Sequence, residues 1–282
     1  MATIADIIRA GEELLSEAGI PDARRDSSTL VSLAIGRDRS FIYSHPEYEP
    51  TAEESERIDQ YLKRRADREP LQYIRGTQEF YGLEFEVTPD VLIPRPETEM
   101  IVEWAIGFLK GEKTTRFLDI GTGTGCIPIS ILKNSPNANG VAVDISSDAL
   151  AVAARNAERN GVAERLELIE SDLFSNVPAE KFDLIVSNPP YVPVKDLAHL
   201  QPEVRDHEPH VALSDGSSGV SIIERIIRDA RHFMLPGGVL LIEMGFGQSE
   251  RVLEFTSTGG WASAQVESDL QGIPRMLYAK SS

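Results

Sequence analysis

The sequence predicts an α/β protein in which a mostly parallel sheet carries helices on both faces, preceded by a small all-helical domain. From residue 115 onward, apolar runs rich in β-branched residues alternate with segments of helical periodicity. That alternation is typical of parallel strands joined by helices. Residues 1–75 show helical periodicity only, and residues 80–87 alternate with a period of two, as a strand or hairpin arm does.

The helices of the first domain are predicted from their boundaries. Thr3 and Thr51 each stand three positions before an acidic residue, in the pattern of a capping box. Gly19 and Gly36 follow apolar periodic segments and are expected to end them. No catalytic cluster occurs in residues 1–75, so we interpret this domain as one that recognises a substrate or partner. A purely structural cap is the alternative.

The next segment, 91–99, presents an arginine on a restrained backbone. Arg95 lies between Pro94 and Pro96, whose rings fix φ. Acidic residues at 97 and 99 stand near the expected start of a helix, where they favour its dipole. The same sequence pattern is also compatible with a plain linker between domains.

The second domain is predicted to alternate strands and helices to its end. Strands are expected at 116–120, 140–144, 166–169, 182–187 and 238–243, with two more at the C-terminus, and helices at 124–133, 147–160, 219–235 and 248–256. Polar residues stand at or just past four of the strand ends: Asp119, Asp144, Asp172 and Asn188. Parallel sheets bind ligands beyond the carboxyl ends of their strands, so these residues are expected to converge on one site.

The first strand leads into a glycine-rich turn, Gly121-Thr122-Gly123-Thr124-Gly125. Glycines let the backbone come close to a ligand. The third glycine comes one residue too early for the dinucleotide fingerprint, and no Gly-Lys-Ser/Thr follows to make a P-loop. Asp119 would repel a phosphate and favours a cationic ligand.

The later strand ends favour an adenosine. Asp144 lies about 20 residues beyond the glycines, where a ribose diol finds its acceptor. Asp172 and Leu173 offer a polar acceptor and an apolar wall for a base. Helix capping would explain any one of these aspartates, but together they point to S-adenosylmethionine, which combines an adenosine with a cationic sulfonium.

The fourth strand ends in Asn188-Pro189-Pro190-Tyr191. The prolines stop the strand and leave carbonyl acceptors, Asn188 adds an amide, and Tyr191 adds a flat ring. This set suits a planar group that bears an N–H, although an ordinary proline turn would also look like this. The acceptors of Asn188 and the prolines would hold such a group, and the ring of Tyr191 would lie against its plane.

Composition limits the classes of function. The net charge of −17, from 28 basic and 45 acidic residues, argues against binding nucleic acid through its phosphates. The single cysteine, Cys126, excludes an internal disulfide. No apolar run approaches the ~20 residues of a membrane span, and the first residues lack the basic start of a signal peptide. We therefore expect a soluble, cytoplasmic protein with no membrane partner.

Together these motifs resemble the HemK/PrmC family, whose members methylate the glutamine of the Gly-Gly-Gln motif in peptide chain release factors. The resemblance rests on the glycine turn after Asp119, the Asn188–Tyr191 motif, and segments 69–76, 91–99 and 205–216. It covers essentially the whole chain. It implies a class I, Rossmann-like methyltransferase fold with a seven-stranded, mostly parallel sheet and a small N-terminal all-α domain.

The resemblance also implies a division of the chain and a set of roles. Residues 1–75 would be the substrate-recognition domain, 76–95 a linker with a short β-hairpin, and 96–282 the S-adenosylmethionine-binding domain. The product would be S-adenosylhomocysteine, no metal is implied, and the enzyme would act as a monomer on release factors, modulating translation termination. Leu173 departs from the aromatic residue that some relatives have there.

The resemblance assigns residues to three roles. Those expected to hold the cofactor are Asp119, Gly121, Thr122, Gly123, Thr124, Gly125, Asp144, Asp172, Leu173 and Asn188. The expected catalytic residues are Asn188, Pro189 and Tyr191, and the substrate residues are Asn188, Pro189, Pro190, Tyr191 and Arg95.

Other readings of the same residues remain open. A DNA or RNA adenine amino-methyltransferase would use Asn188-Pro189-Pro190-Tyr191 in the same way on an extruded base. A nicotinamide-dependent oxidoreductase is disfavoured by the glycine spacing, and a non-catalytic cofactor-binding adaptor by the complete motif. Glu243, at a strand end, is interpreted as a pocket residue or as a cap or ion-pair partner. His207 is expected in a loop, and Cys126 as a small core residue.

Overall fold

The computed structural model describes residues 2–111, 113–257 and 260–282, and these form two compact units. The first unit contains the residues up to Gly76 together with 201–207, and the second contains 77–200 and 208–282. The chain therefore leaves the second unit after Leu200 and returns to it at Glu208. Met1, at which the predicted first domain begins, lies outside the described residues.

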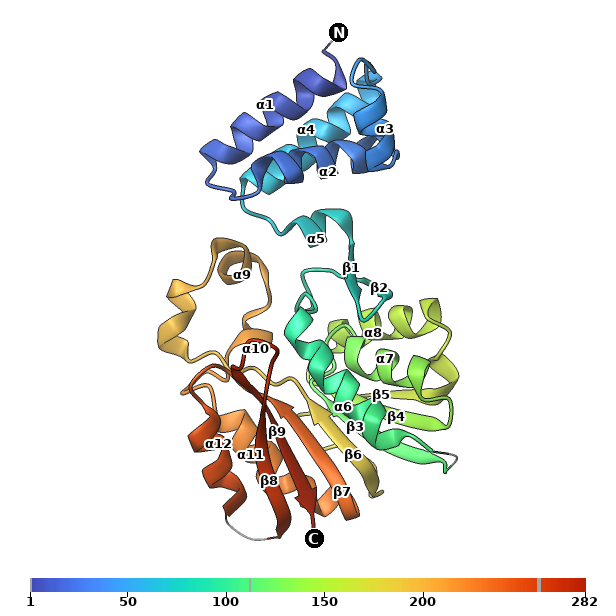
Figure 1. Ribbon diagram of the computed structural model, residues 1–282, viewed down its shortest axis with the longest axis vertical. Helices are drawn as coiled ribbons and strands as arrows, with labels where there is room; N and C mark the ends of the chain where they lie inside the picture. The colour runs from blue at the N-terminus through green and yellow to red at the C-terminus, as the bar shows by residue number, and fades with distance from the viewer. Residues whose placement is uncertain (1, 112, 258–259) are drawn as a thin grey trace. The chain divides into compact units, whose positions relative to one another are not determined.

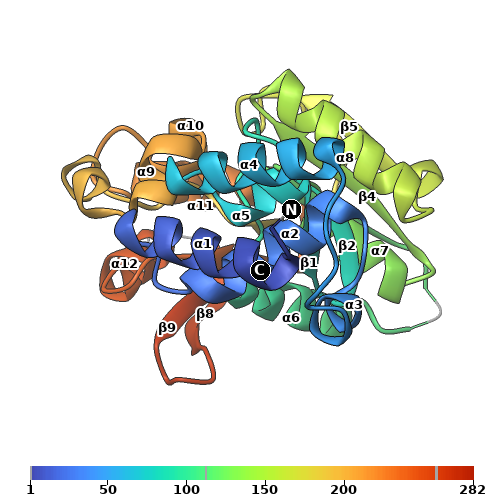
Figure 2. The same cartoon turned by 90° about the horizontal axis from the view of Figure 1, so that it is seen from above.

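The first unit is all helical. Its helices are α1 (Ile4–Glu17), α2 (Ala23–Ile35), α3 (Arg39–Ser44), α4 (Ala52–Ala66), α5 (Leu71–Arg75) and α9 (Pro202–His207). The predicted capping boxes are confirmed, because Thr3 and Thr51 each exchange hydrogen bonds with the acidic residue three positions on. Helices α1, α2 and α4 pack together around an apolar core that includes Leu15, Leu30 and Ile58 (Figure 2).

Helix α9 belongs to the first unit because buried ion pairs fix it there. Glu203 accepts hydrogen bonds from Arg65 at 3.1 Å and from Arg68 at 2.7 Å. Arg65 also donates to Asp26 at 2.8 Å, and its side chain is only 8% exposed. A buried guanidinium needs such carboxylate partners, so this network determines where residues 201–207 lie.

The second unit begins with a hairpin of β1 (Thr77–Phe80) and β2 (Leu83–Glu86), which confirms the strand predicted over 80–87. Tyr81 and Gly82 form its turn, both with positive φ, as a two-residue hairpin loop of the primed type requires. A 3-10 turn, η1 (Pro96–Thr98), then leads into α6 (Glu99–Leu109).

The main sheet has seven strands in the order β5-β4-β3-β6-β7-β9-β8. They are β3 (Thr115–Ile120), β4 (Ala138–Asp144), β5 (Leu166–Glu170), β6 (Phe182–Ser187), β7 (Met234–Glu243), β8 (Trp261–Ser268) and β9 (Pro274–Ser281). In the described part of the chain, β9 pairs antiparallel with both β7 and β8 and every other pairing of this sheet is parallel, so the predicted mostly parallel sheet is confirmed. The strand order reverses between β3 and β6, which makes their carboxyl ends the switch point where such sheets bind ligands.

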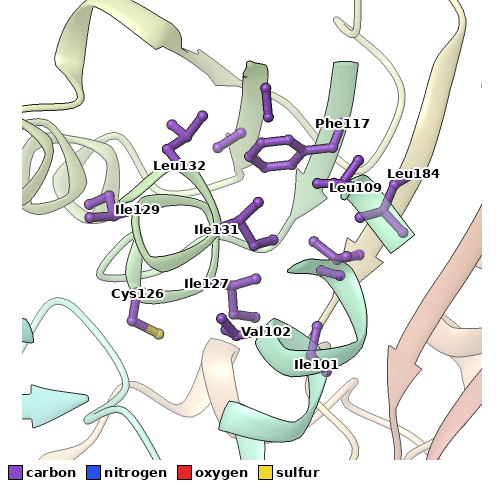
Figure 3. Close-up of a cluster of buried hydrophobic side chains, with 14 of the residues drawn as sticks. Ile101, Val102, Leu109, Phe117, Cys126, Ile127, Ile129, Ile131, Leu132 and Leu184 are labelled. Carbon is purple, nitrogen blue, oxygen red and sulfur yellow. The ribbon is translucent and has the colours of Figure 1, made fainter. Parts of the chain in front are cut away.

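Helices cover both faces of this sheet (Figure 1). On one face lie α6, α7 (Cys126–Asn134) and α8 (Ser147–Arg159); on the other lie α11 (Ser221–Ala230) and α12 (Ser249–Ser257). Successive strand residues point to opposite faces. Thus Phe117 and Leu184 pack against α6 and α7 (Figure 3), whereas Leu118 packs against α11.

Some predicted boundaries were wrong. Helix α11 ends at Ala230, not at 235, and is followed by η4 (Arg231–Phe233) and the start of β7 at Met234. A bulge interrupts the β6–β7 ladder between Met234 and Val239, where Pro236 has no N–H to pair. Short elements that no prediction covered include η2 (Ala163–Arg165), η3 (Val194–His199), α10 (His210–Leu213) and the helix α9 of the first unit. Across the described ranges, no helix has the length and apolar character needed to cross a membrane.

Candidate active site

A cavity opens at the carboxyl ends of the central strands and collects most of the predicted site residues. Its lining includes the loops after β3, β4, β5 and β6, through Gly121, Gly123, Asp144, Asp172, Leu173, Asn188, Pro189 and Pro190. Apolar side chains of α11, Ile222 and Ile226, complete one wall. The strand-end residues Gly121 and Pro190, 69 positions apart in sequence, therefore line one cavity because parallel strands end at the same edge.

The glycine turn after β3 brings bare backbone to this cavity. Gly121 and Gly123 have φ of 75° and 54°, and a Cβ on either would meet no other atom within 4 Å. Since both glycines line the cavity, this open space is available to a ligand. Gly125 differs: a Cβ there would lie 2.9 Å from Ile129 Cδ1, so its role is the close packing of α7.

Asp119, the fifth residue of β3, is a buried carboxylate without a hydrogen-bond partner. Its side chain is 0% exposed, and neither oxygen has a partner of ordinary geometry among residues that the structure describes. Burial raises the pKa of Asp119 to about 7 and the nearby Asp144 carboxylate adds to this rise, while the Thr122 hydroxyl opposes it. Asp119 itself is not among the residues that line the cavity, although Gly121 and Gly123 of the turn that follows it are. Two unused acceptors beside this turn fit the ammonium group of an amino-acid ligand.

Asp144 at the end of β4 joins the glycine turn to the cavity. Its Oδ2 accepts from Gly123 N at 2.8 Å, and its Oδ1 accepts from Ser146 N at 3.0 Å. Burial nevertheless raises the pKa of Asp144. Each carboxylate oxygen can accept a further bond, as the two hydroxyls of a ribose would require.

The turn after β5 holds a strained residue. Leu173 has φ of 51°, a region that residues with a Cβ rarely adopt, and it lines the cavity. Ser171 Oγ donates to the Leu173 carbonyl at 2.9 Å and helps to maintain this turn. The carboxylate of Asp172 is engaged elsewhere, by Arg225 Nη2 at 3.1 Å, so Leu173 supplies the surface expected for a base.

Asn188 and Pro189 present acceptors to the cavity. Asn188 Nδ2 donates to Thr98 Oγ1 at 3.0 Å, which leaves Oδ1 as the free end of the amide. Among the described residues, neither Asn188 Oδ1 nor the Pro189 carbonyl accepts a hydrogen bond. Ser187 Oγ donates to the Ile120 carbonyl at 2.7 Å and ties the ends of β6 and β3 together.

Tyr191 lies beside this cavity rather than in its lining. Its hydroxyl donates to Glu243 Oε1 at 3.1 Å, and its carbonyl accepts from Gln248 Nε2 at 2.9 Å. Burial raises the pKa of Tyr191, and the Glu243 charge raises it further. The phenol therefore stays protonated and serves as a donor.

Arg95 also lies outside the cavity lining. Its guanidinium pairs with the carboxylate of Glu208, which also accepts from Ile93 N at 3.3 Å. The Glu208 side chain is 1% exposed. The observed contact of Arg95 therefore fixes the 93–95 segment.

Several other predicted residues serve the structure around the site. Thr124 Oγ1 accepts from Cys126 N at 3.3 Å, and neither Thr122 nor Thr124 lines the cavity. Cys126 is confirmed as a core residue (Figure 3), and burial raises its pKa to about 12. His207, expected in a loop, is the last residue of α9, where its Nε2 lies 3.2 Å from the Asp67 carbonyl.

The residues that hold these groups in place are ones that no prediction named, namely Thr98, Glu208 and Gln248. Each acts through a contact that is distant in sequence, to Asn188, Arg95 and Tyr191 respectively. The segments 91–99 and 205–216 did contain the first two. No pattern in the sequence indicates a role for Gln248.

Comparison with known proteins identifies the family of the chain. The family model "PrmC N-terminal domain" matches residues 6–76, and "Methyltransferase small domain" matches residues 104–201. A solved methyltransferase from Pyrococcus furiosus shares the fold, with a TM-score of 0.52 at 21% identity, over 71% of this chain and 90% of that one.

Curated relatives match over nearly the full length. "Release factor glutamine methyltransferase" of Geobacter sulfurreducens is 44% identical, over 98% of this chain and 95% of the relative. The protein of the same name from Cereibacter sphaeroides is 43% identical, over 98% of both chains. The chain therefore belongs to the release factor glutamine methyltransferase family.

Proposed function

We propose that this protein transfers a methyl group from S-adenosylmethionine to the side-chain amide nitrogen (N5) of the glutamine in the Gly-Gly-Gln motif of a peptide chain release factor. One observation carries the proposal: the unpaired acceptors of Asn188 and Pro189 line the same cavity as the glycine turn and Asp144. A site for an adenosine ligand and a site for a planar N–H group are thus joined. The names of the relatives support the choice of substrate.

Specific residues would hold the cofactor. Asp119 would accept from its ammonium group, Gly121 and Gly123 would let it approach the backbone, Asp144 would bind the ribose, and Leu173 would contact the adenine. When bound, S-adenosylmethionine supplies an electrophilic methyl group on sulfur. The open glycine positions and the unpaired Asp119 oxygens support this assignment.

The contribution of the protein to the reaction is to position the nucleophile. An amide nitrogen is a weak nucleophile because its lone pair is delocalised into the carbonyl group. Asn188 Oδ1 and the Pro189 carbonyl would accept its two N–H bonds, aim the nitrogen at the methyl carbon and stabilise the positive charge that develops there. The bound cofactor would give up its methyl group to the nitrogen and its sulfur would keep the electron pair of the broken bond, while the substrate nitrogen would release a proton to water.

We further propose that the enzyme works as a cytoplasmic monomer on a protein partner and not on nucleic acid. Release factors act where translation ends, in the cytoplasm. The net charge of −17 supports a protein substrate, because proteins that bind nucleic acid phosphates usually carry a basic surface.

Transfer of label tests the proposal. The enzyme is incubated with methyl-labelled S-adenosylmethionine and either a release factor or its Gly-Gly-Ala variant, and in parallel with single-stranded DNA and RNA. We expect label in the release factor only when the glutamine is present. Equal labelling of the alanine variant, or labelling of nucleic acid instead of the release factor, would overturn the assignment.

A further inference from the structure

Glu243 ends β7 next to the residues proposed to bind the substrate amide. The residue is 3% exposed, and its Oε1 accepts from the Tyr191 hydroxyl at 3.1 Å. Its Oε2 is buried and has no hydrogen bond of ordinary geometry in the described part of the chain. The proposed reaction does not use this carboxylate, so its burial needs another explanation.

Thr98 links Glu243 to Asn188. Thr98 is 2% exposed, and its Oγ1 accepts from Asn188 Nδ2 at 3.0 Å. The hydroxyl hydrogen of Thr98 still needs an acceptor, and Thr98 lies close enough to Glu243 to lower the pKa of that carboxyl as a donor would. The spare acceptor of Glu243 and the spare donor of Thr98 therefore complement each other.

A carboxylate at position 243 determines the direction of this chain of hydrogen bonds. Because an ionised carboxylate can only accept, a Thr98 hydroxyl that turns toward it can only donate, and Thr98 then offers only lone pairs to Asn188. The Asn188 side chain must turn its NH₂ group toward Thr98. Its Oδ1 is thereby directed to the cavity, as acceptance of an amide N–H requires.

We propose that Glu243 is a positioning residue of the methyl-transfer site, which orients the Asn188 amide through the Thr98 hydroxyl and holds Tyr191 through its phenol. This inference rests on the proposed role of Asn188 in binding the substrate amide. It assigns to Thr98 and Glu243 a part in setting which end of Asn188 faces the substrate.

Protonation of Glu243 should reverse the direction of the hydrogen bonds that link Glu243, Thr98 and Asn188, which we call the relay. Burial, the main cause, raises its pKa to about 7; Glu97 adds to the rise, while Thr98, Tyr191 and Arg275 oppose it. Cys126, the other titratable neighbour, is neutral over this range because burial raises its pKa to about 12. A protonated Glu243 can donate to Thr98, and Thr98 is then no longer forced to accept from Asn188.

Nuclear magnetic resonance of the Asn188 side chain tests the relay without reference to any substrate. In protein labelled with ¹⁵N at asparagine, the Asn188 NH₂ signals are identified by their loss in Asn188→Ala. We expect them to titrate with a midpoint near pH 7 in the wild type and in Thr98→Ser, and not in Thr98→Val or Glu243→Gln. The same titration in Thr98→Val as in the wild type would overturn the proposal.

Kinetics supply the second readout, with Thr98→Val, which keeps the size of the native side chain but not its hydroxyl, and Thr98→Ser, which keeps the hydroxyl. We expect Thr98→Val to lower kcat on a release factor between about tenfold and a hundredfold, and to leave S-adenosylhomocysteine affinity unchanged. Thr98→Ser should restore the greater part of that loss. An equal loss in both variants would contradict the relay. Failure of the wild type itself to methylate release factors would overturn the proposed function, whereas the resonance titration judges the relay.

Discussion

At the scale of single residues, the site consists of acceptors that the fold leaves unpaired. Both oxygens of Asp119 and one of Glu243 are buried without a hydrogen bond of ordinary geometry in the described ranges. Each such group costs stability in the free protein. Their positions at the ends of β3 and β7 indicate that ligand binding and positioning, rather than folding, account for them.

Asn188→Ala separates substrate positioning from cofactor binding. The variant loses the acceptor Oδ1, while Gly121, Asp119 and Asp144 remain. We expect kcat to fall by about a hundredfold or more, since misplacement of a reacting group carries costs of that size, with little change in S-adenosylhomocysteine affinity measured by calorimetry. Asn134→Ala, at the end of α7, is the matched control. Turnover at the wild-type rate in Asn188→Ala would exclude the proposed role.

Asp119→Asn should raise stability and weaken cofactor binding. The pKa of Asp119 is raised from 3.8 to about 7, so its contribution to stability is complete below pH 4 and is lost as pH rises through 7. At pH 8 the neutral amide should therefore raise the free energy of unfolding, by on the order of 1–3 kcal/mol.

Urea unfolding at pH 5 and pH 8 measures this effect, with the exposed Asp59→Asn as control. We expect the gain of Asp119→Asn to be larger at pH 8, together with weaker S-adenosylhomocysteine binding. A variant that is less stable than the wild type at pH 8 would show that the carboxylate has a partner in the free protein.

At the scale of elements, the glycine turn divides into a ligand-facing part and a packing part. Gly121→Ala imposes a positive φ on alanine but meets no atom, so we expect a loss of roughly 1 kcal/mol in stability and a clear loss of cofactor affinity. Gly125→Ala adds overlap with Ile129 and Ala153, and should cost roughly 2–4 kcal/mol. Denaturant unfolding measures the stability of both variants, and calorimetry measures their affinity for the cofactor. A Gly121→Ala variant less stable than Gly125→Ala would refute this division of roles.

Elements set by local signals could be predicted, and elements set by distant pairing could not. The capping boxes at Thr3 and Thr51 lie within four residues of sequence, and both were found. The start of β7 depends on its pairing with β6 across a bulge, so the helix expected to reach 235 was too long. Helix α9 depends on the pairing of Glu203 with Arg65, which is 138 positions away.

At the scale of the whole molecule, the chain of the second unit contributes a segment to the first. Glu203 keeps its pKa low although burial opposes this, because its backbone N–H and the guanidinium groups of Arg68 and Arg65 favour the charge. Glu203→Ala would leave both arginines short of a partner, and should destabilise the first unit by on the order of 2 kcal/mol.

Hydrogen exchange of residues 201–207 and of α4 tests this arrangement, with Glu250→Ala on α12 as control. In Glu203→Ala we expect faster amide hydrogen exchange in both residues 201–207 and α4. In the control we expect exchange at the wild-type rate in both segments. Unchanged protection of 201–207 would mean that Glu203 does not anchor the segment.

The part of the site that lies at the strand ends could be predicted from the sequence. In a parallel sheet, chain order alone brings strand ends together, and so Gly121, Asp144, Leu173 and Asn188 were placed correctly at one cavity. The contacts of Thr98, Glu208 and Gln248 depend on how loops fold over the sheet, and no local sequence pattern predicts the path of those loops. The motif indicated a planar nitrogen; the resemblance and the relatives indicated which one.

Tandem mass spectrometry of a release factor after reaction with the enzyme and S-adenosylmethionine tests the central claim most directly. The account predicts the mass of one added methyl group on the glutamine of the Gly-Gly-Gln motif, and none when Asn188→Ala replaces the wild type. A methyl group on any other residue, or an unmodified glutamine after complete reaction with the wild-type enzyme, would contradict it.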